Sequence, residues 1–160
     1  MLRRILFISL TALLSNACTP TPSSEFSETD RASIAEAVQQ RVDGYCPAVL
    51  SKDVEYLKVF WADVPEWASA WDGEIKEGAS FMGDLLQTWY EGESEHFYCN
   101  MSNSRVYVLG PDAASLATEF EWGMVNAEAD TVESYGSWMY VFSRLDGEWR
   151  VIHSAGTHLY

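Results

Sequence analysis

The chain has 160 residues, 48% of them hydrophobic, and its formal net charge is −14. This length favours one domain, and the hydrophobic content argues against intrinsic disorder. A chain this acidic is repelled by phosphate backbones and by anionic lipids, so nucleic acid is not an expected partner.

The chain opens with a segment typical of export. A short basic start at residues 1–4 is followed by an apolar run at residues 5–14 and by small residues that end at Ala17. This is the pattern of a secretory signal, and the apolar run is too short to span a bilayer. Residues 13–18 also resemble a bacterial lipobox, which predicts a lipid on Cys18. Ordinary cleavage after Ala17 is the alternative.

Residues 18–28 are polar and rich in Pro and Ser, and we expect a disordered tether there. The predicted domains are thus a signal peptide at 1–17, the tether, and one folded domain at 29–160. The protein is expected to be exported. It is then either lipid-anchored to the cell envelope, facing the periplasm, or soluble in the periplasm. Acyl chains on Cys18 would be its only attachment to a membrane, because no basic patch assists them.

The first half of the folded domain is predicted to be helical. An apolar stripe at helical spacing indicates a helix at residues 30–50, which Gly44 and Pro47 should kink or interrupt. A second helix is expected at 53–61 and a third at 78–90.

Extended structure is expected between the second and third helices. Residues 62–71 contain Pro65, which lacks an amide donor, so this segment is expected to be at most an edge strand. Asp72 and Gly73 then form a turn.

The hydrophobic period changes from helical to two after residue 92. Strands are predicted at 94–101, at 104–109 continuing to 115–125, at 131–145 and at 148–158. Asp146 and Gly147 are a strong hairpin turn between the last two. Helices followed by an antiparallel meander make the expected fold class α+β.

Three segments resemble, in the same order, segments of the nuclear transport factor 2-like superfamily. This superfamily includes SnoaL-like proteins and the association domain of calcium/calmodulin-dependent kinase II. The segments are residues 51–64, 106–114 and 145–154, and the resemblance extends over about residues 30–158. The chain departs from the family pattern at Ala155, where a second His is frequent, and at Thr157, where Ser is frequent.

The resemblance implies an α+β fold in which a curved antiparallel sheet wraps like a cone over three N-terminal helices and leaves a pocket. It also implies homodimerisation through the outer face of the sheet. Members of the superfamily include isomerases, dehydratases, ligand-binding proteins and assembly domains, so the fold alone does not assign a function.

Two cysteines, Cys46 and Cys99, remain after the signal segment. In an oxidising periplasm they indicate a disulfide, and two buried free thiols are the alternative.

The candidate general acid or base is His153, because the pKa of histidine is the most easily tuned near neutrality. Its expected partner is Tyr140 on the preceding strand. A half-buried histidine bonded to the backbone is the alternative. Glu121 beside either residue would make a proton-abstracting dyad, but strand alternation points Glu121 outward if Phe120 and Trp122 face inward.

The chain has seven Trp, eight Tyr and seven Phe, which either fill the core or line a pocket for an apolar ligand. Strand alternation places His96 and Tyr98 on one face. The ligand-binding residues we predict are Phe60, Trp89, His96, Tyr98, Trp122 and Trp138.

No metal site is predicted, because the chain has three His and alternation points His153 and His158 to opposite faces. The sequence contains no phosphate loop, nucleophile elbow or CxxC pair, so no cofactor is expected. Two functions remain open. The first is a cell-envelope module that binds a small apolar molecule or another protein without catalysis. The alternative is a cofactor-free isomerase or dehydratase that uses His153 with Tyr140, Tyr98 or an acidic partner.

Overall fold

The computed structural model describes residues 26–78, 80–91 and 94–160 of the chain. Within these stretches it describes every side chain except those of residues 89–91. The predicted signal peptide at 1–17, the lipidation site Cys18 and most of the predicted tether lie outside the described residues. Export and lipid anchoring therefore stay predictions, and so does the ligand-binding role of Trp89.

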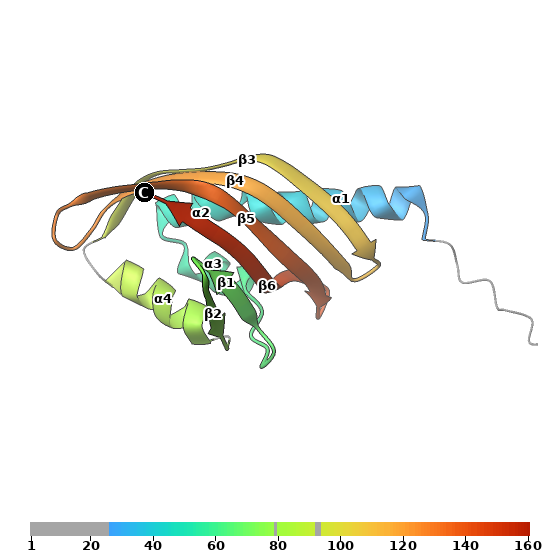
Figure 1. Cartoon of the computed structure of the whole chain (residues 1–160). Coiled ribbons are helices and arrows are strands. Elements are labelled where there is room, and N and C mark those ends of the chain that lie inside the picture. The colour runs from blue at the N-terminus through green and yellow to red at the C-terminus, as the bar shows by residue number, and fades with distance from the viewer. Residues whose placement is uncertain (1–25, 79, 92–93) are drawn as a thin grey trace, which may run out of the picture.

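Four helices occur in the described residues (Figure 1): α1 Glu28–Asp43, α2 Tyr45–Ser51, α3 Val54–Phe60 and α4 Ser80–Glu91. The first predicted helix is thus two helices, separated at Gly44. No side chain would fit there, because a Cβ on Gly44 would lie 2.2 Å from the hydroxyl oxygen of Tyr56. Within the described stretches, no helix is long and apolar enough to cross a membrane.

Six strands in the described residues form one open sheet in the order β2-β1-β6-β5-β4-β3. Their bounds are β1 Ala68–Trp71, β2 Glu74–Glu77, β3 Glu95–Gly110, β4 Ala113–Val125, β5 Thr131–Leu145 and β6 Glu148–Leu159. All neighbours pair antiparallel except β1 and β6, which run parallel. The sheet is therefore mixed, not antiparallel throughout as the sequence predicts.

The first two strands differ from the prediction for this part of the chain. β1 lies between β2 and β6, so it is not the edge strand that the sequence predicts at most; β2, which the sequence does not predict, lies at that edge of the sheet. Pro65 precedes β1 and removes no hydrogen bond from its ladder. The second predicted strand, 104–109 continuing to 115–125, is divided between two strands. Residues 104–109 belong to β3 together with the strand predicted at 94–101, and 115–125 belong to β4, which turns back and pairs antiparallel with β3. A register shift lies in the middle of β3.

The sheet arches over the helices, and the core lies between them (Figure 1). The apolar stripe predicted for the first helix is buried there: Ile34, Val38 and Val42. Phe60 of α3 contacts the rings of Tyr140 and Phe142 on β5 at 5.6 and 5.9 Å, both near a right angle. Aromatic residues thus supply much of the contact between the helices and the sheet.

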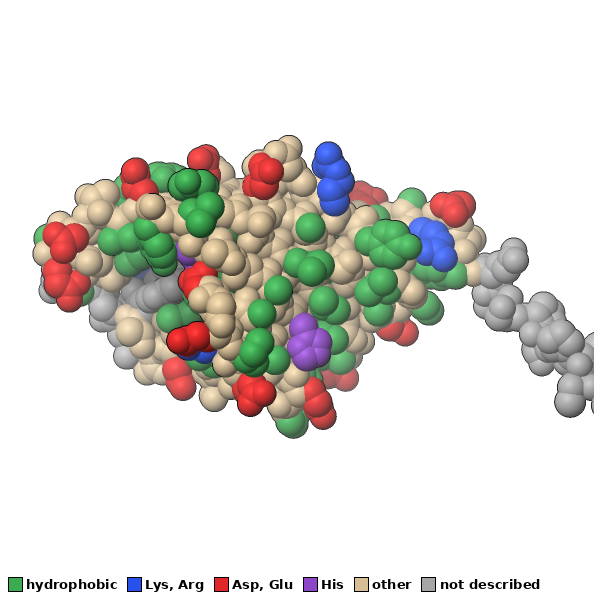
Figure 2. Space-filling view, viewed as in Figure 1, with side chains coloured by type: hydrophobic (Ala, Val, Ile, Leu, Met, Phe, Trp, Pro, Cys, Tyr) green, Lys and Arg blue, Asp and Glu red, His purple; other side chains and the backbone are tan. Residues whose placement is uncertain are grey.

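The opposite face of the sheet carries exposed hydrophobic side chains, among them Tyr107, Leu109, Tyr135, Met139 and Leu159. Figure 2 shows hydrophobic side chains gathered over the strands, with carboxylates scattered between them. We call this the outer face. It is the surface through which the resemblance implies homodimerisation, and the dimer stays a prediction.

A β-bulge in β6 decides which of its side chains face inward. The β5–β6 register shifts between Val141 and Phe142 of β5, which leaves Ile152 of β6 as the extra residue. A bulge interrupts the two-residue alternation of a strand. Val151 is therefore buried before the bulge, and after it the inward series continues to His158.

Candidate functional site

A cavity of about 70 Å³ lies between the helices and the inner face of the sheet. Of the twelve described residues that line it, seven carry Phe, Tyr or Trp rings: Tyr45, Trp61, Trp71, Phe120, Trp122, Trp138 and Tyr140. They come from α2, from the residue after α3, from β1 and from strands β4 and β5. A buried water needs roughly 10–15 Å³, so the cavity has room for about five water-sized groups.

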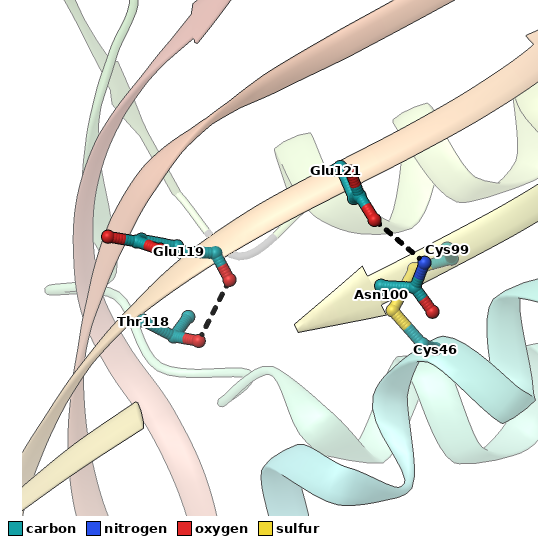
Figure 3. The surroundings of a disulfide bond; sticks show 6 residues. All are labelled: Cys46, Cys99, Asn100, Thr118, Glu119 and Glu121. Carbon is teal, nitrogen blue, oxygen red and sulfur yellow. Dashed lines mark hydrogen bonds between the residues drawn. A yellow bond between two sulfur atoms is a disulfide. The ribbon is translucent and has the colours of Figure 1, made fainter. Parts of the chain in front are cut away.

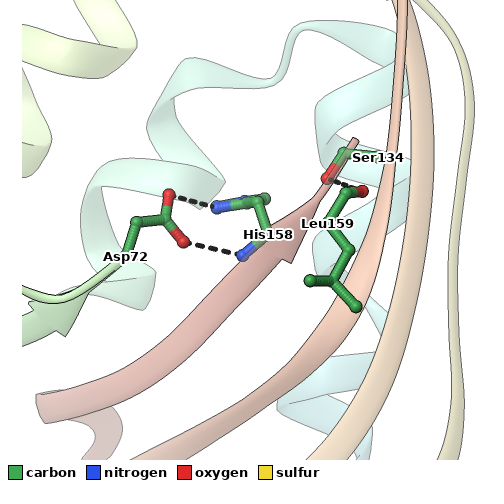
Figure 4. Close-up of polar contacts among 4 residues, drawn as sticks. All are labelled: Asp72, Ser134, His158 and Leu159. Carbon is green, nitrogen blue, oxygen red and sulfur yellow. Dashed lines mark hydrogen bonds and ion pairs between the residues drawn. The ribbon is translucent and has the colours of Figure 1, made fainter.

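Asp72 and His158 form a two-point contact at this cavity (Figure 4). The ring Nδ1 of His158 lies 2.9 Å from Asp72 Oδ2, and the backbone N–H of His158 donates to Oδ1 at 2.7 Å. The His158 side chain is 9% exposed and the Asp72 side chain 33%.

Asp72 is a carboxylate at neutral pH. Burial acts to raise its pKa, but the hydrogen bonds and the charge of His158 outweigh burial, so the pKa of Asp72 is lowered. A carboxylate can only accept hydrogen bonds, so the proton shared with it sits on Nδ1 of His158.

The sheet topology brings these two residues together from 86 positions apart. Asp72 and Gly73 have φ angles of 51° and 86°, as the central residues of a tight hairpin turn between β1 and β2 require. β1 runs parallel to β6 with Trp71 opposite Gly156, and the backbone N–H of Asp72 donates to the Gly156 carbonyl at 3.2 Å. The turn therefore lies beside the end of β6, where His158 stands.

Aromatic rings surround the His158 ring. Its centroid lies 5.1 Å from that of Phe120, 5.2 Å from Trp138, 5.3 Å from Trp71 and 5.9 Å from Trp122. Apolar rings exclude water, and electrostatic interactions are stronger where water is excluded. The Asp72–His158 pair is therefore placed where a small ligand would meet it in an apolar setting.

Two predicted site residues, His96 and Tyr140, line the same cavity. Burial lowers the pKa of His96, and the charge of Lys52 lowers it further, so its imidazole is uncharged at neutral pH. Burial raises the pKa of Tyr140 well above its ordinary value, and Tyr45 adds to the effect, so its phenol keeps its proton. Both side chains can therefore hydrogen-bond a ligand without carrying charge.

A disulfide joins Cys46 of α2 to Cys99 of β3, with the Cα atoms 5.2 Å apart (Figure 3). The sequence left a disulfide and two buried free thiols as alternatives, and the structure contains the disulfide. Cys99 also lines the cavity. Its neighbour Asn100 donates at 3.0 Å to Glu121, which is exposed, as the alternation of β4 predicts. The disulfide thus fixes the α2 wall of the cavity against β3.

His153, the predicted catalytic residue, does not line the cavity. It is exposed, and it pairs with Val141 across the β5–β6 ladder. The bulge at Ile152 shifts the alternation, so the closing-strand histidine that lines the cavity is His158. The predicted contact of His153 with Tyr140 is therefore wrong, and Tyr140 shares the cavity with His158 instead.

Tyr98 does not line the cavity either. A register shift between His96 and Tyr98 separates the faces that these two residues were expected to share. The Tyr98 ring contacts the ring of Phe97 at 5.2 Å and lies over Gly123, where a Cβ would be 2.4 Å from it. It is therefore a surface residue on the other side of the strand.

The remaining predicted ligand-binding residues divide between the cavity wall and the core. Trp122 and Trp138 line the cavity. Phe60 is fully buried behind the wall, where its ring contacts those of Tyr45 and Trp61 at 4.7 and 5.2 Å. It supports the site without lining it.

Sequence reasoning missed Asp72, His158 and the two indoles of Trp61 and Trp71. Two segments have a partial signal: Trp71 directly precedes the Asp72-Gly73 turn, and His158 closes the last predicted strand. Neither signal shows that the two segments meet. In the described part of the chain, no group of three His, Cys, Asp or Glu side chains could hold a metal ion.

No protein-family model matches the sequence, and no curated protein matches it. Solved structures do match. A nuclear transport factor 2-like superfamily protein from Salmonella enterica serovar Typhimurium aligns with a TM-score of 0.68 and 15% sequence identity, over 79% of this chain and 91% of that one.

Two further matches carry the names of enzymes. A ketosteroid isomerase-like protein from Erwinia carotovora atroseptica has a TM-score of 0.64 and 12% identity, over 79% of this chain and 96% of that one. A candidate scytalone dehydratase from Novosphingobium aromaticivorans has a TM-score of 0.70 and 12% identity, over 84% and 89%. Identities this low show a shared fold and leave the ligand open.

Proposed function

Starting from the nuclear transport factor 2-like fold that the chain shares with these structures, we propose that it is a cofactor-free proton-transfer enzyme of the isomerase or dehydratase (lyase) class. The observation that carries the proposal is the Asp72–His158 pair at the wall of an aromatic cavity. A histidine held by a carboxylate in an apolar site is the arrangement that general-base catalysis needs.

His158 is the base in this proposal. With a proton on Nδ1, the lone pair lies on Nε2, which can take a proton from a bound molecule. Asp72 touches the ring and not the reacting atoms, so it is a positioning residue. It fixes the tautomer and stabilises the imidazolium that forms when His158 accepts a proton.

Tyr140 and His96 supply hydrogen bonds to the substrate. Removing a proton next to a carbonyl group leaves negative charge on the oxygen, and donors aimed at that charge lower the barrier. Tyr140 keeps its phenolic proton because burial raises its pKa. His96 is uncharged because burial and Lys52 lower its pKa, and a neutral imidazole still carries one N–H donor.

The structural neighbours are consistent with this class. Two of them bear the names of an isomerase-like protein and of a candidate dehydratase. Names borne by proteins of such low identity do not transfer an activity. The support specific to this chain is therefore the geometry of its own residues.

The test is a base-catalysed isomerisation that needs no cofactor. We expect the protein to convert cyclohex-3-en-1-one to its conjugated isomer, measured as a rise in ultraviolet absorbance. His158→Gln should lower the rate roughly 10²–10⁴-fold, the usual contribution of one general base. His153→Gln is the matched control and should leave the rate unchanged, because His153 is exposed and does not line the cavity.

A second function is favoured if His158→Gln leaves the rate as it was or if the protein does not accelerate the reaction. The chain would then be a ligand-binding module without catalysis. In that case Asp72 and His158 only brace the β1–β2 turn against β6. The cavity wall, seven of whose twelve lining residues carry Phe, Tyr or Trp rings, is the observation that supports this alternative.

A further inference from the structure

The aromatic rings of the cavity wall meet at steep angles and do not lie flat on one another. Trp71 and Trp138 are 5.0 Å apart at 76°, Phe120 and Trp138 are 6.0 Å apart at 71°, and Trp61 and Tyr140 are 5.9 Å apart at 59°. All five of these residues line the cavity, and rings inclined in this way can turn parts of their faces toward a group that lies among them. The face of each ring carries the negative part of its quadrupole, so a small cation among them is attracted by several rings at once.

The charges around the cavity also favour a positively charged ligand. Among the residues that the structure describes, no Lys or Arg lines it, and the carboxylate of Asp72 is bonded to the ring of His158, which does line it. Lys52 acts on His96 from an exposed position and is not part of the wall. The chain as a whole carries −14, and a protein this acidic concentrates cations near its surface. An anionic ligand would find no ammonium or guanidinium partner in the wall.

The size of the cavity limits the ligand to a compact group. Its volume is about 70 Å³, which is roughly five water-sized groups. A trimethylammonium head with its attached methylene has five heavy atoms, which matches that number. Such a head has no N–H to satisfy, and it can therefore be enclosed by aromatic rings without a hydrogen-bond acceptor.

We propose that the cavity binds a compact organic cation of the quaternary ammonium class. The inference rests on the proposed function only in that the same cavity is the binding site, and it needs no proton transfer. A neutral apolar molecule would gain the same burial, but it would gain nothing from the ring faces or from Asp72. The charge of the ligand is therefore the property to test.

The experiment compares two molecules of the same shape. Choline and 3,3-dimethylbutan-1-ol differ in having a quaternary nitrogen or a quaternary carbon, so only the first is charged. We expect isothermal titration calorimetry to show choline binding at least about tenfold more tightly, since several cation–π contacts add. Trp122→Leu should weaken choline binding about fivefold, whereas Trp122→Phe, which keeps a ring, should retain most of it.

Tyr135→Leu is the control for loss of an aromatic ring, because Tyr135 is 58% exposed on the outer face. It should bind choline like the native protein. Equal binding of the two molecules, binding of neither, or equal weakening by Trp122→Leu and Tyr135→Leu would each overturn the inference. A preference for choline together with an isomerisation rate that His158→Gln does not change would overturn the proposed function alone.

Discussion

Asp72 closes a two-residue turn and also holds His158, and the sequence signals only the first of these. An Asp-Gly pair between extended segments is fully explained by backbone conformation. Nothing in the pattern indicates a contact with a residue 86 positions away. His96, Trp122 and Trp138 could be predicted as pocket residues, because large side chains on strands that cover helices face either the interior or the solvent.

Replacing Asp72 with Asn should lower the melting temperature most at neutral pH. The pKa of Asp72 in the folded protein lies below its ordinary value of 3.8. The stabilising contact is therefore fully present above that pH and is lost as the pH falls through the folded-state pKa. Thermal unfolding followed by circular dichroism should show the two proteins converging below about pH 4. A difference that stays constant with pH would contradict this assignment.

The strand β6 shows why alternation predicts the existence of a strand better than its faces. The prediction of 148–158 agrees closely with the observed Glu148–Leu159, because the Asp-Gly turn before it is a strong signal. The bulge at Ile152 has no such signal, since a β-branched residue fits a regular strand equally well. His153 was therefore predicted on the wrong face.

Gly156 of β6 is expected to be intolerant of a side chain. It lies opposite Trp138 on one neighbouring strand and Trp71 on the other, and a Cβ there would be 2.0 Å from the Trp138 ring. Gly156→Ala should therefore displace the indole and cost about 1–3 kcal/mol of unfolding free energy, as overpacking does. Urea denaturation followed by tryptophan fluorescence measures the loss.

Gly110→Ala is the matched control for that measurement. Gly110 ends β3, and a Cβ there would meet no atom within 4 Å. The urea midpoint of the Gly110→Ala variant should equal or slightly exceed that of the native protein, because alanine lowers the conformational entropy of the unfolded chain. Equal midpoints for the two variants would mean that the Trp138 ring moves aside without cost.

For the whole molecule, the order of elements predicted the α+β class, and the resemblance to the nuclear transport factor 2-like superfamily supplied the curved sheet over the helices. Helices with one apolar stripe and strands of period two have few ways to bury their apolar sides together. The parallel pairing of β1 with β6 could not be predicted. It depends on how the assembled layers come together, which no local pattern encodes. The Cys46–Cys99 disulfide was one of the two alternatives that the sequence indicated, because no other cysteine follows the signal segment and its following Cys18.

The disulfide should contribute substantially to global stability. It joins residues 53 positions apart, and the chain-entropy model gives about 4 kcal/mol for closing a loop of that length. The double variant Cys46→Ser, Cys99→Ser should therefore unfold at a lower urea concentration than the native protein. Adding a reductant should shift the native protein toward the variant and leave the variant itself unchanged. Coinciding curves without reductant would rule out this contribution.

The extra residue in β6 also affects how this chain is compared with its evolutionary relatives. A relative that lacks the insertion at Ile152 would keep the same interior and surface positions in a strand one residue shorter. A gap-free alignment would then place His153 in the column of an interior residue, and His158 in the column of a surface one. Conservation scores computed from such columns would select the wrong histidine. An alignment guided by three-dimensional superposition, with a gap opposite Ile152, is needed before related sequences can inform this site.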